Sequence, residues 1–213
     1  MELLQAMTTR RSARRYATAV PIETIEEMLA VAASAPSACN RRGWRCILVQ
    51  RREDMEWLYR QGGSAVFLES GQALLVCYEG QTENSEWDDN IQSAAAFIAY
   101  FQLIAHDRGI GSCWICHLPP KREVSEHFNI PPLYTPIAMI TFGVYPEEQS
   151  LQARIDNKPV SLSVDRWSFD SGGVYVLKTA FQLRTLFRRL YFALPFRGWL
   201  RGWAGHYEKK FDK

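Results

Sequence analysis

Long hydrophobic runs are missing from this sequence, and so is an export signal. No stretch of 18 apolar residues occurs among its 213 residues, so we expect no membrane-spanning helix. The first 16 residues, MELLQAMTTRRSARRY, lack the apolar core of a secretory signal peptide. A chain that is not exported keeps its cysteines reduced. We therefore expect the five cysteines to be thiols in the cytoplasm.

A strong charge of either sign is also missing, because the formal net charge is only +2. Such a balance implies no nucleic-acid partner. Hydrophobic residues make up 47% of the chain and charged residues 23%, a composition that favours a packed core over disorder. The length fits one domain, alone or with an appendage.

The charge is nevertheless unevenly placed. Residues 172–213 contain nine Lys/Arg and two Asp/Glu, a net of +7, which leaves −5 for the rest of the chain. The stretch SFDSGG, residues 168–173, resembles a linker. We therefore predict a domain of residues 1–167 and a basic, aromatic tail of residues 168–213. Three interpretations of the tail stay open: an arm over a partner subunit, a segment on an anionic membrane surface, or a lid over an anionic substrate.

Helical and strand patterns alternate along the chain, which predicts an α/β or α+β class with helices packed on a sheet. The longest helix is expected to start at an aspartate cap and to be apolar on nearly all sides. Helices are expected over residues 2–7, 21–35, 53–61, 88–109 and 121–129, and strands over residues 45–50, 73–78, 112–118 and 137–145.

Two stretches have residues that suit an anionic, flat ligand. RRSARR, residues 10–15, offers four arginines and a serine as donors to phosphate oxygens, unless it is only a solvated charge run. APSACNRRGW, residues 35–44, puts small residues after a helix end, where the backbone can approach a ring, and Asn40 can both donate and accept. A plain helix-to-strand loop is the alternative.

The third stretch is GIGSCWICH, residues 109–117, which ends in C-x-x-C-H. That string fits a c-type haem attachment, a redox dithiol, part of a zinc site, or a buried strand with two cysteines. Haem attachment needs export. A redox pair prefers a helix N-terminus, whereas this pair follows the end of a helix. These considerations favour the strand.

Taken in order, the three stretches resemble the nitroreductase family of flavin enzymes. Members show R-R-S-x-R, then A-P-S-x-x-N-x-Q-P-W, then G-L-G-S after a long helix; this chain has RRSAR, APSACNRRGW and GIGSCW, with FGVYP downstream. The resemblance covers about residues 5–165. It implies an α+β, three-layer α-β-α fold with a central mixed or antiparallel sheet flanked by helices. It also implies a homodimer with FMN at the subunit interface.

The resemblance also implies cofactor-binding roles. The arginine segment would hold the FMN phosphate and ribityl chain, the loop after the second helix would lie against the isoalloxazine, and the third stretch would present its backbone to flavin N5. The matching residues are Arg10, Arg11, Ser12 and Arg14; Pro36, Ser37, Ala38 and Asn40; and Trp114, Ile115 and Cys116. Arg154 and Lys158 stand near the place of a basic phosphate contact that many members have.

One departure from the family pattern concerns charge. Arg42 and Gly43 replace the Gln and Pro of N-x-Q-P-W. Arg41 and Arg42 put two positive charges beside the flavin loop. An anionic substrate or cofactor would account for them, and so would a solvated loop.

The implied function is an FMN-dependent oxidoreductase that passes hydride from NADH or NADPH to a small nitro- or quinone-type acceptor. No Ser-His-Asp or Cys-His set and no metal spacing is visible, so we name no catalytic residue and no metal. The alternatives are a specialised member, reductive dehalogenase-like or flavin-consuming, and a flavin-binding scaffold without turnover.

Overall fold

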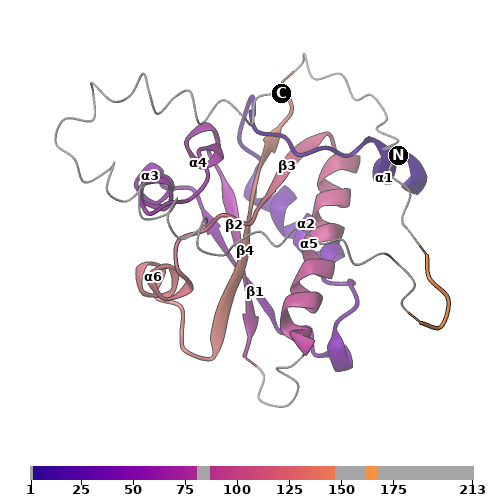
Figure 1. The fold of residues 1–213 in the computed structure, drawn as a ribbon. Coiled ribbons are helices and arrows are strands. Elements are labelled where there is room, and N and C mark those ends of the chain that lie inside the picture. The colour runs from indigo at the N-terminus through magenta and orange to yellow at the C-terminus, as the bar shows by residue number, and fades with distance from the viewer. Residues whose placement is uncertain (1, 81–86, 147–161, 167–213) are drawn as a thin grey trace. The chain divides into compact units, whose positions relative to one another are not determined.

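The computed structural model describes residues 2–80, 87–146 and 162–166 (Figure 1). The chain divides into one unit of residues 1–157 and another of residues 158–213, and all helices and strands described below lie in the first unit. The tail falls outside the described residues, so its predicted boundary and its role stay predictions. No helix in the described part is both long and apolar enough to cross a membrane.

The sheet is antiparallel throughout, and its described strands lie in the order β1-β2-β4-β3. Strands β2 and β4 are therefore central, and β3 is an edge strand. The strands are β1 (Trp44–Val49), β2 (Ala73–Glu79), β3 (Ile110–Ile115) and β4 (Tyr134–Val144). This confirms the predicted α+β fold with a central sheet.

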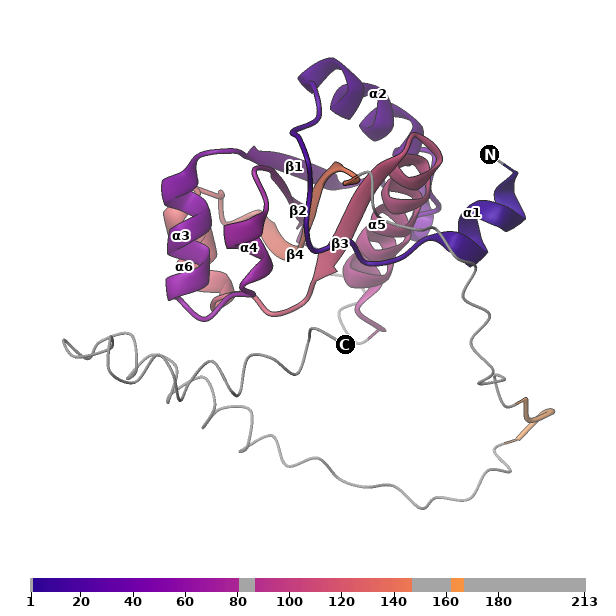
Figure 2. The same cartoon turned by 90° about the horizontal axis from the view of Figure 1, so that it is seen from above.

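Helices cover both faces of the sheet, because β2 and β4 bury side chains on both faces (Figures 1 and 2). On β2, Leu74 and Val76 pack in one core cluster with α2 and α5, while Leu75 and Cys77 pack in another with α3, α4 and α6. The alternation follows from the two-residue period of a strand. The helices are α2 (Ile22–Ala32), α3 (Arg52–Arg60), α4 (Val66–Glu69), α5 (Asp89–Asp107) and α6 (Lys121–His127).

Every helix and strand that the sequence predicts is present, with shifts at the ends. Strand β3 begins and ends earlier than predicted, and the short helix α4 was missed. Asp88 stands at the cap position of α5, as predicted, but its backbone is left-handed and its side chain forms no capping hydrogen bond. Helix α5 buries one face within the chain, while Ile91 near its start and Tyr100 on the opposite side are exposed.

A polar joint connects α3 to α6. The Asp54 carboxylate accepts hydrogen bonds from Arg51 Nε at 3.0 Å and from His127 Nε2 at 2.8 Å. The His127 ring stacks on Trp57 with 3.8 Å between centroids. Burial alone would raise the pKa of Asp54, but the hydrogen bonds from His127 and Arg51 outweigh it and hold the pKa below its usual value.

We predict that Asp54→Asn lowers the free energy of unfolding by about 1–2 kcal/mol at pH 7. This is the range expected for loss of the two charged hydrogen bonds from His127 and Arg51, because Arg51 is largely exposed and its bond contributes little. The folded-state pKa is depressed, so the stabilisation is complete above about pH 4 and is lost as the pH falls through the folded pKa. Urea unfolding at pH 7 and at a pH below about 4 measures how much free energy of unfolding the substitution removes at each pH.

The matched control is Glu56→Gln on the same helix. Glu56 forms exposed ion pairs with Arg52 and Arg60, and such pairs contribute about 0.5 kcal/mol or less. Equal effects of the two substitutions at pH 7 would contradict the assignment of a special joint at Asp54.

Candidate functional site at the edge of the sheet

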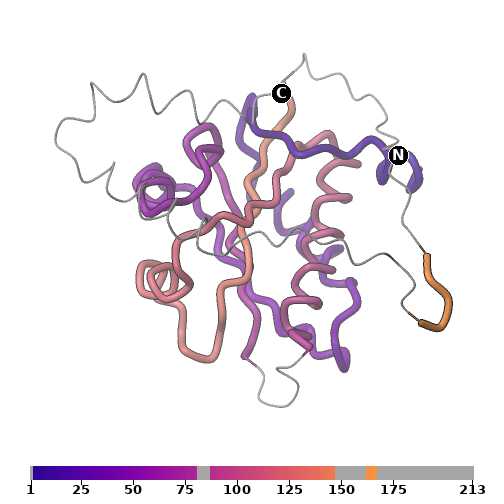
Figure 3. The backbone as a smooth tube through the Cα atoms, in the orientation of Figure 1, coloured from indigo at the N-terminus to yellow at the C-terminus, as the bar shows by residue number. Residues whose placement is uncertain are grey.

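The N-terminal arginine segment lies against β3. Helix α1 (Leu3–Thr9) ends just before it, and the chain then crosses one end of the sheet in extended form (Figure 3). Ser12 forms a parallel bridge with Ser112, and Ala13 N donates to Ser112 O at 3.0 Å. Ala17 N donates to Val144 O at 2.9 Å. Two of the three predicted stretches are thus side by side.

A glycine permits this close approach. A Cβ placed on Gly111 would lie 2.7 Å from the Cβ of Ala13 and 2.9 Å from the ring of Tyr145. Real Cβ atoms do not tolerate such distances, and Ala13 is itself buried. The glycine before Ser112 in GIGS is therefore needed for the arginine segment to lie on the strand.

The segment presents cationic donors to solvent. Ser12 and Arg14 are exposed, and Arg10 and Arg11 are half-buried. Within the described residues, no carboxylate forms an ion pair with Arg10 or Arg14. Guanidinium groups that protein carboxylates leave free, beside a serine hydroxyl, suit a phosphate.

The outer edge of β3 offers a backbone donor next to these arginines. Ser112 O points outward, because it accepts from Ala13, and backbone groups alternate in direction along an antiparallel strand. The N–H of Trp114 therefore also points outward, while Cys113 and Ile115 face β4 through their pairs with Thr141 and Met139. An outward N–H at this edge is a donor for a flat, heteroatom-rich ligand.

C-x-x-C-H is a strand and its end. Cys113 lies inside β3 and is buried, whereas Cys116 and His117 follow the strand and are exposed. Burial raises the pKa of the Cys113 thiol, and Arg14 only partly opposes this. A redox dithiol needs a lowered pKa. Among the described residues, no three His, Cys, Asp or Glu side chains are grouped as a metal site requires.

We predict that replacing Cys113 and Cys116 together by Ala leaves the rate of flavin reduction by NAD(P)H within roughly tenfold, about 1.4 kcal/mol of barrier. The reason is that the backbone of β3, not sulfur, faces the proposed cofactor. Stopped-flow kinetics of the FMN-loaded variant measure the rate. A loss of several orders of magnitude with FMN still bound would instead indicate a dithiol relay.

The second predicted stretch forms a strained loop at the other end of α5. Ala38 N donates to Ser93 Oγ at 3.0 Å, and Ser37 Oγ accepts from Arg42 N at 3.0 Å. Asn40 Oδ1 accepts from Arg42 Nε at 3.0 Å. Asn40 and Arg42 have left-handed backbones, φ 54° and 49°, a strain that functional loops often hold.

Within a single chain, this loop does not lie next to the arginine segment. The loop is tied to Ser93, near the start of α5, whereas Gln102 Nε2, farther along the helix, donates to Ser112 Oγ at 3.3 Å beside the arginines. Nine helical residues separate the two ties, roughly 14 Å of rise. Figure 1 shows the arginine segment and the connection from α2 to β1 at opposite ends of α5.

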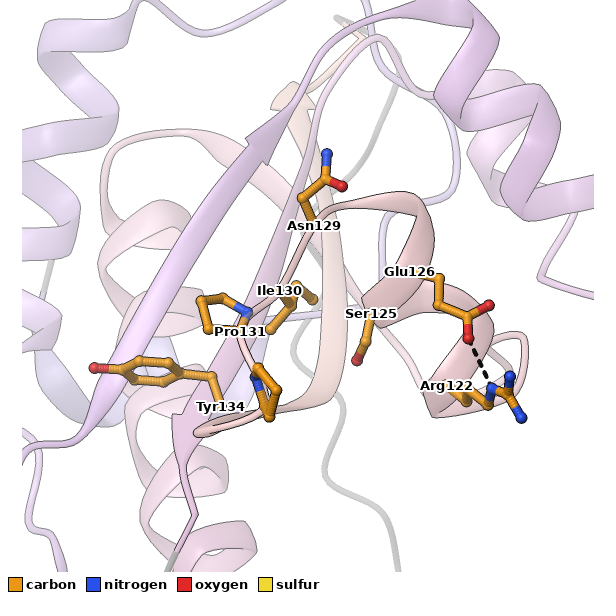
Figure 4. A pocket seen from close by; sticks show the side chains of 8 residues that line it. Arg122, Ser125, Glu126, Asn129, Ile130, Pro131 and Tyr134 are labelled. Carbon is orange, nitrogen blue, oxygen red and sulfur yellow. Dashed lines mark hydrogen bonds and ion pairs between the residues drawn. The ribbon is translucent and has the colours of Figure 1, made fainter.

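The remaining predicted residues, Arg154 and Lys158, lie outside the described part of the chain. A surface depression of about 660 Å³ lies beside α6 and the start of β4, and it contains no predicted site residue (Figure 4). Its lining includes Arg122, which is paired with Glu126 at 2.7 Å.

The arrangement of an arginine segment on an edge strand after a long helix agrees with the sequence resemblance. A comparison with protein families decides which family the chain belongs to. The Nitroreductase family matches residues 7–62 and 57–144. The chain belongs to the nitroreductase family.

Several proteins are similar to this nitroreductase-family chain. A protein of Methanothermobacter thermautotrophicus, provisionally named NADH dehydrogenase/NAD(P)H nitroreductase, is 29% identical over 174 residues, 78% of this chain and 88% of the relative. A relative of the same name from Archaeoglobus fulgidus is 27% identical, over 78% of this chain and 99% of its own. The solved FMN-dependent nitroreductase of Clostridium difficile R20291 matches with a TM-score of 0.63 and 26% identity, over 75% of this chain and 98% of its own.

Proposed function

We propose that this nitroreductase-family protein is an FMN-dependent oxidoreductase that uses NADH or NADPH to reduce a small organic acceptor of the nitro or quinone type. The observation that supports it most is the pairing of Ser12 with Ser112, because it puts cationic donors and an outward backbone N–H in one place. Bound FMN would supply the hydride chemistry. The chain itself would bind, orient and shield.

The residues present fit FMN. Arg10 and Ser12 have the donors that a phosphate needs. The outward N–H of Trp114 is placed to donate to a ring nitrogen at the strand edge. Gly111 keeps the two elements close enough for one ligand to reach both. A guanidinium beside the ring would also stabilise the negative charge of a reduced flavin, and we assign this task to Arg14.

We further propose that the site is completed by a second copy of the chain. The loop of residues 36–40 is held about two and a half helical turns from the arginine segment, so the loop of a partner would have to lie against the ring. Apolar side chains without cover support this: Leu4 and Met7 on α1, and Ile91 and Tyr100 on α5, are exposed in the single chain. A homodimer would bury them.

Arg41 and Arg42 lead to a prediction about the ligand. Both are exposed, and Asn40 holds the Arg42 guanidinium in place. If they receive an anion, replacing both by Gln should lower kcat/KM about tenfold or more for the anionic ligand, as expected for lost charged hydrogen bonds. Two comparisons identify the anion: NADPH against NADH, and a carboxylated nitroaromatic acceptor against an uncharged one.

If kcat/KM stays unchanged for both nucleotides and for both acceptors, the two arginines are only part of a solvated loop. Arg52→Gln with Arg60→Gln is the charge-matched control, because these arginines lie on α3 and pair with Glu56.

The proposed function is tested by adding NADH or NADPH, without oxygen, to the FMN-loaded protein. Loss of the yellow colour with either nucleotide, and its return when a nitro or quinone acceptor is added, is the expected result. A yellow protein that neither nucleotide bleaches would contradict the oxidoreductase and favour a flavin-binding scaffold.

A further inference from the structure

A buried histidine connects three elements behind the arginine segment. His106 is in the last turn of α5 and is only 1% exposed. Its Nε2 lies 2.8 Å from Thr9 Oγ1, at the end of α1, and its Nδ1 lies 3.3 Å from Tyr145 Oη, just after β4. The family resemblance named neither His106 nor Thr9, and neither belongs to the three motif stretches.

The proton on each atom of this network follows from its neighbours. Thr9 Oγ1 lies 2.7 Å from the carbonyl oxygen of Gln5, and two oxygens that close need a hydrogen between them. The single hydroxyl proton of Thr9 is thus used, so Thr9 accepts from His106 Nε2–H. The other ring nitrogen then carries no proton and accepts from the Tyr145 hydroxyl.

The network is adjacent to the phosphate donors. Thr9 is followed directly by Arg10, and Tyr145 packs at Gly111, where the Ala13 side chain also lies. One turn earlier on α5, Gln102 donates to Ser112. Helix α5 therefore holds both the start of the arginine segment and the strand on which that segment lies.

We propose that His106 is a positioning residue: through Thr9 and Tyr145 it holds the arginine segment in register on β3, and so sets the geometry in which that segment receives an anionic cofactor. The cofactor part of this proposal rests on the proposed function. His106 does not touch the cofactor in this account, and it acts only through its two hydrogen-bond partners.

The proposal includes a dependence on pH. Burial lowers the pKa of His106, the positive charge of Arg10 lowers it further, and Asp107 opposes them. Tyr145 is the titratable group on the other side, and burial raises its pKa. The pKa of His106 is therefore lower in the folded chain than in the unfolded chain, so the attachment is complete above about pH 6.5 and weakens as the pH falls from there towards the folded pKa.

Trypsin cleavage of the protein without FMN tests the positioning role, because trypsin cuts after the four arginines of residues 10–15 and needs the segment to leave β3. We expect His106→Leu to raise the initial cleavage rate about tenfold, as two buried hydrogen bonds are lost. His106→Gln, whose amide can donate to Thr9 and accept from Tyr145, should restore it. Ile98→Val, a buried change on the same helix, is the control for general destabilisation. Thr9→Val with Tyr145→Phe serves if the Leu variant does not fold.

Wild-type cleavage in His106→Leu, or equal cleavage in His106→Leu and His106→Gln, would overturn the proposal. The cleavage rate of the wild-type protein, divided by that of His106→Gln, should rise as the pH is lowered from about 7.5 to 5.5, because the Gln variant has no ionisable group at position 106. A ratio that stays constant over this range would contradict the pH dependence. In an FMN titration, His106→Leu should bind FMN about tenfold more weakly than the wild-type protein, whereas His106→Gln should not. An unchanged FMN affinity of His106→Leu would refute the link to the cofactor. A wild-type protein that binds no FMN would defeat the proposed function, while the cleavage pattern would still decide the role of His106.

Discussion

Replacing Arg10 and Arg14 together by Ala should abolish FMN binding at micromolar concentrations. Each arginine is expected to contribute about 1.5–3 kcal/mol as a charged hydrogen-bond donor, so the double variant should lose about two to four orders of magnitude in affinity. The gain from each is large because no carboxylate in the described part of the chain pairs with either. Quenching of FMN fluorescence by the protein measures the affinity.

Arg15→Ala is the control for this experiment. Arg15 is exposed and belongs to the same run, but it does not match a family position. Its loss should change the affinity by about threefold or less, as expected for long-range electrostatics screened by salt. Full FMN affinity in the double variant, or an equal loss in Arg15→Ala, would contradict a specific FMN site at Arg10 and Arg14.

At an FMN concentration that loads the wild-type protein but neither of two weakened variants, mixing the subunits of the two variants should restore binding. Arg14→Ala damages the arginine segment, and Ala38→Trp puts a bulky ring on the loop that we assign to the partner's site. Half of the dimers in an equal mixture are mixed, and each mixed dimer has one undamaged site of two. The mixture should therefore regain about one quarter of the wild-type sites.

The control mixes Arg10→Ala with Arg14→Ala. Both changes are on the same segment, so no dimer in that mixture has an undamaged site, and no binding should return. Subunits are exchanged by co-expression with two affinity tags, and FMN bound per chain is measured. Failure of the first mixture to regain sites would show that the loop and the arginines do not combine across two chains.

The fold was predictable where apolar residues repeat over enough length. Strand β2 and helix α5 have clear patterns, and both are present. Helix α4 was not predictable because its four residues are too few for a helical period, although Phe67 is fully buried. Asp88 stands at the predicted cap position, but its left-handed backbone differs from the extended backbone that a capping residue usually has, and its side chain forms no capping hydrogen bond.

The site was predictable in its parts but not in its assembly. The family resemblance assigns cofactor roles to Arg10, Asn40 and Trp114, and these roles stay predictions, whereas the strand interpretation of Cys113 is confirmed. The bridge between Ser12 and Ser112 joins residues far apart in the sequence, and no local pattern encodes it. The separation of the loop from the arginines depends on how α5 packs, and the role of His106 depends on partners from two other elements.

Sedimentation followed by the visible absorbance of the flavin tests the central claim most directly, because it reports cofactor and assembly in one experiment. With FMN added in slight excess, the account predicts a yellow boundary that sediments as twice the 24.5 kDa chain and contains about one FMN per chain. Flavin absorbance that stays at the rate of free FMN, or that moves with a stable monomer of 24.5 kDa, would contradict it.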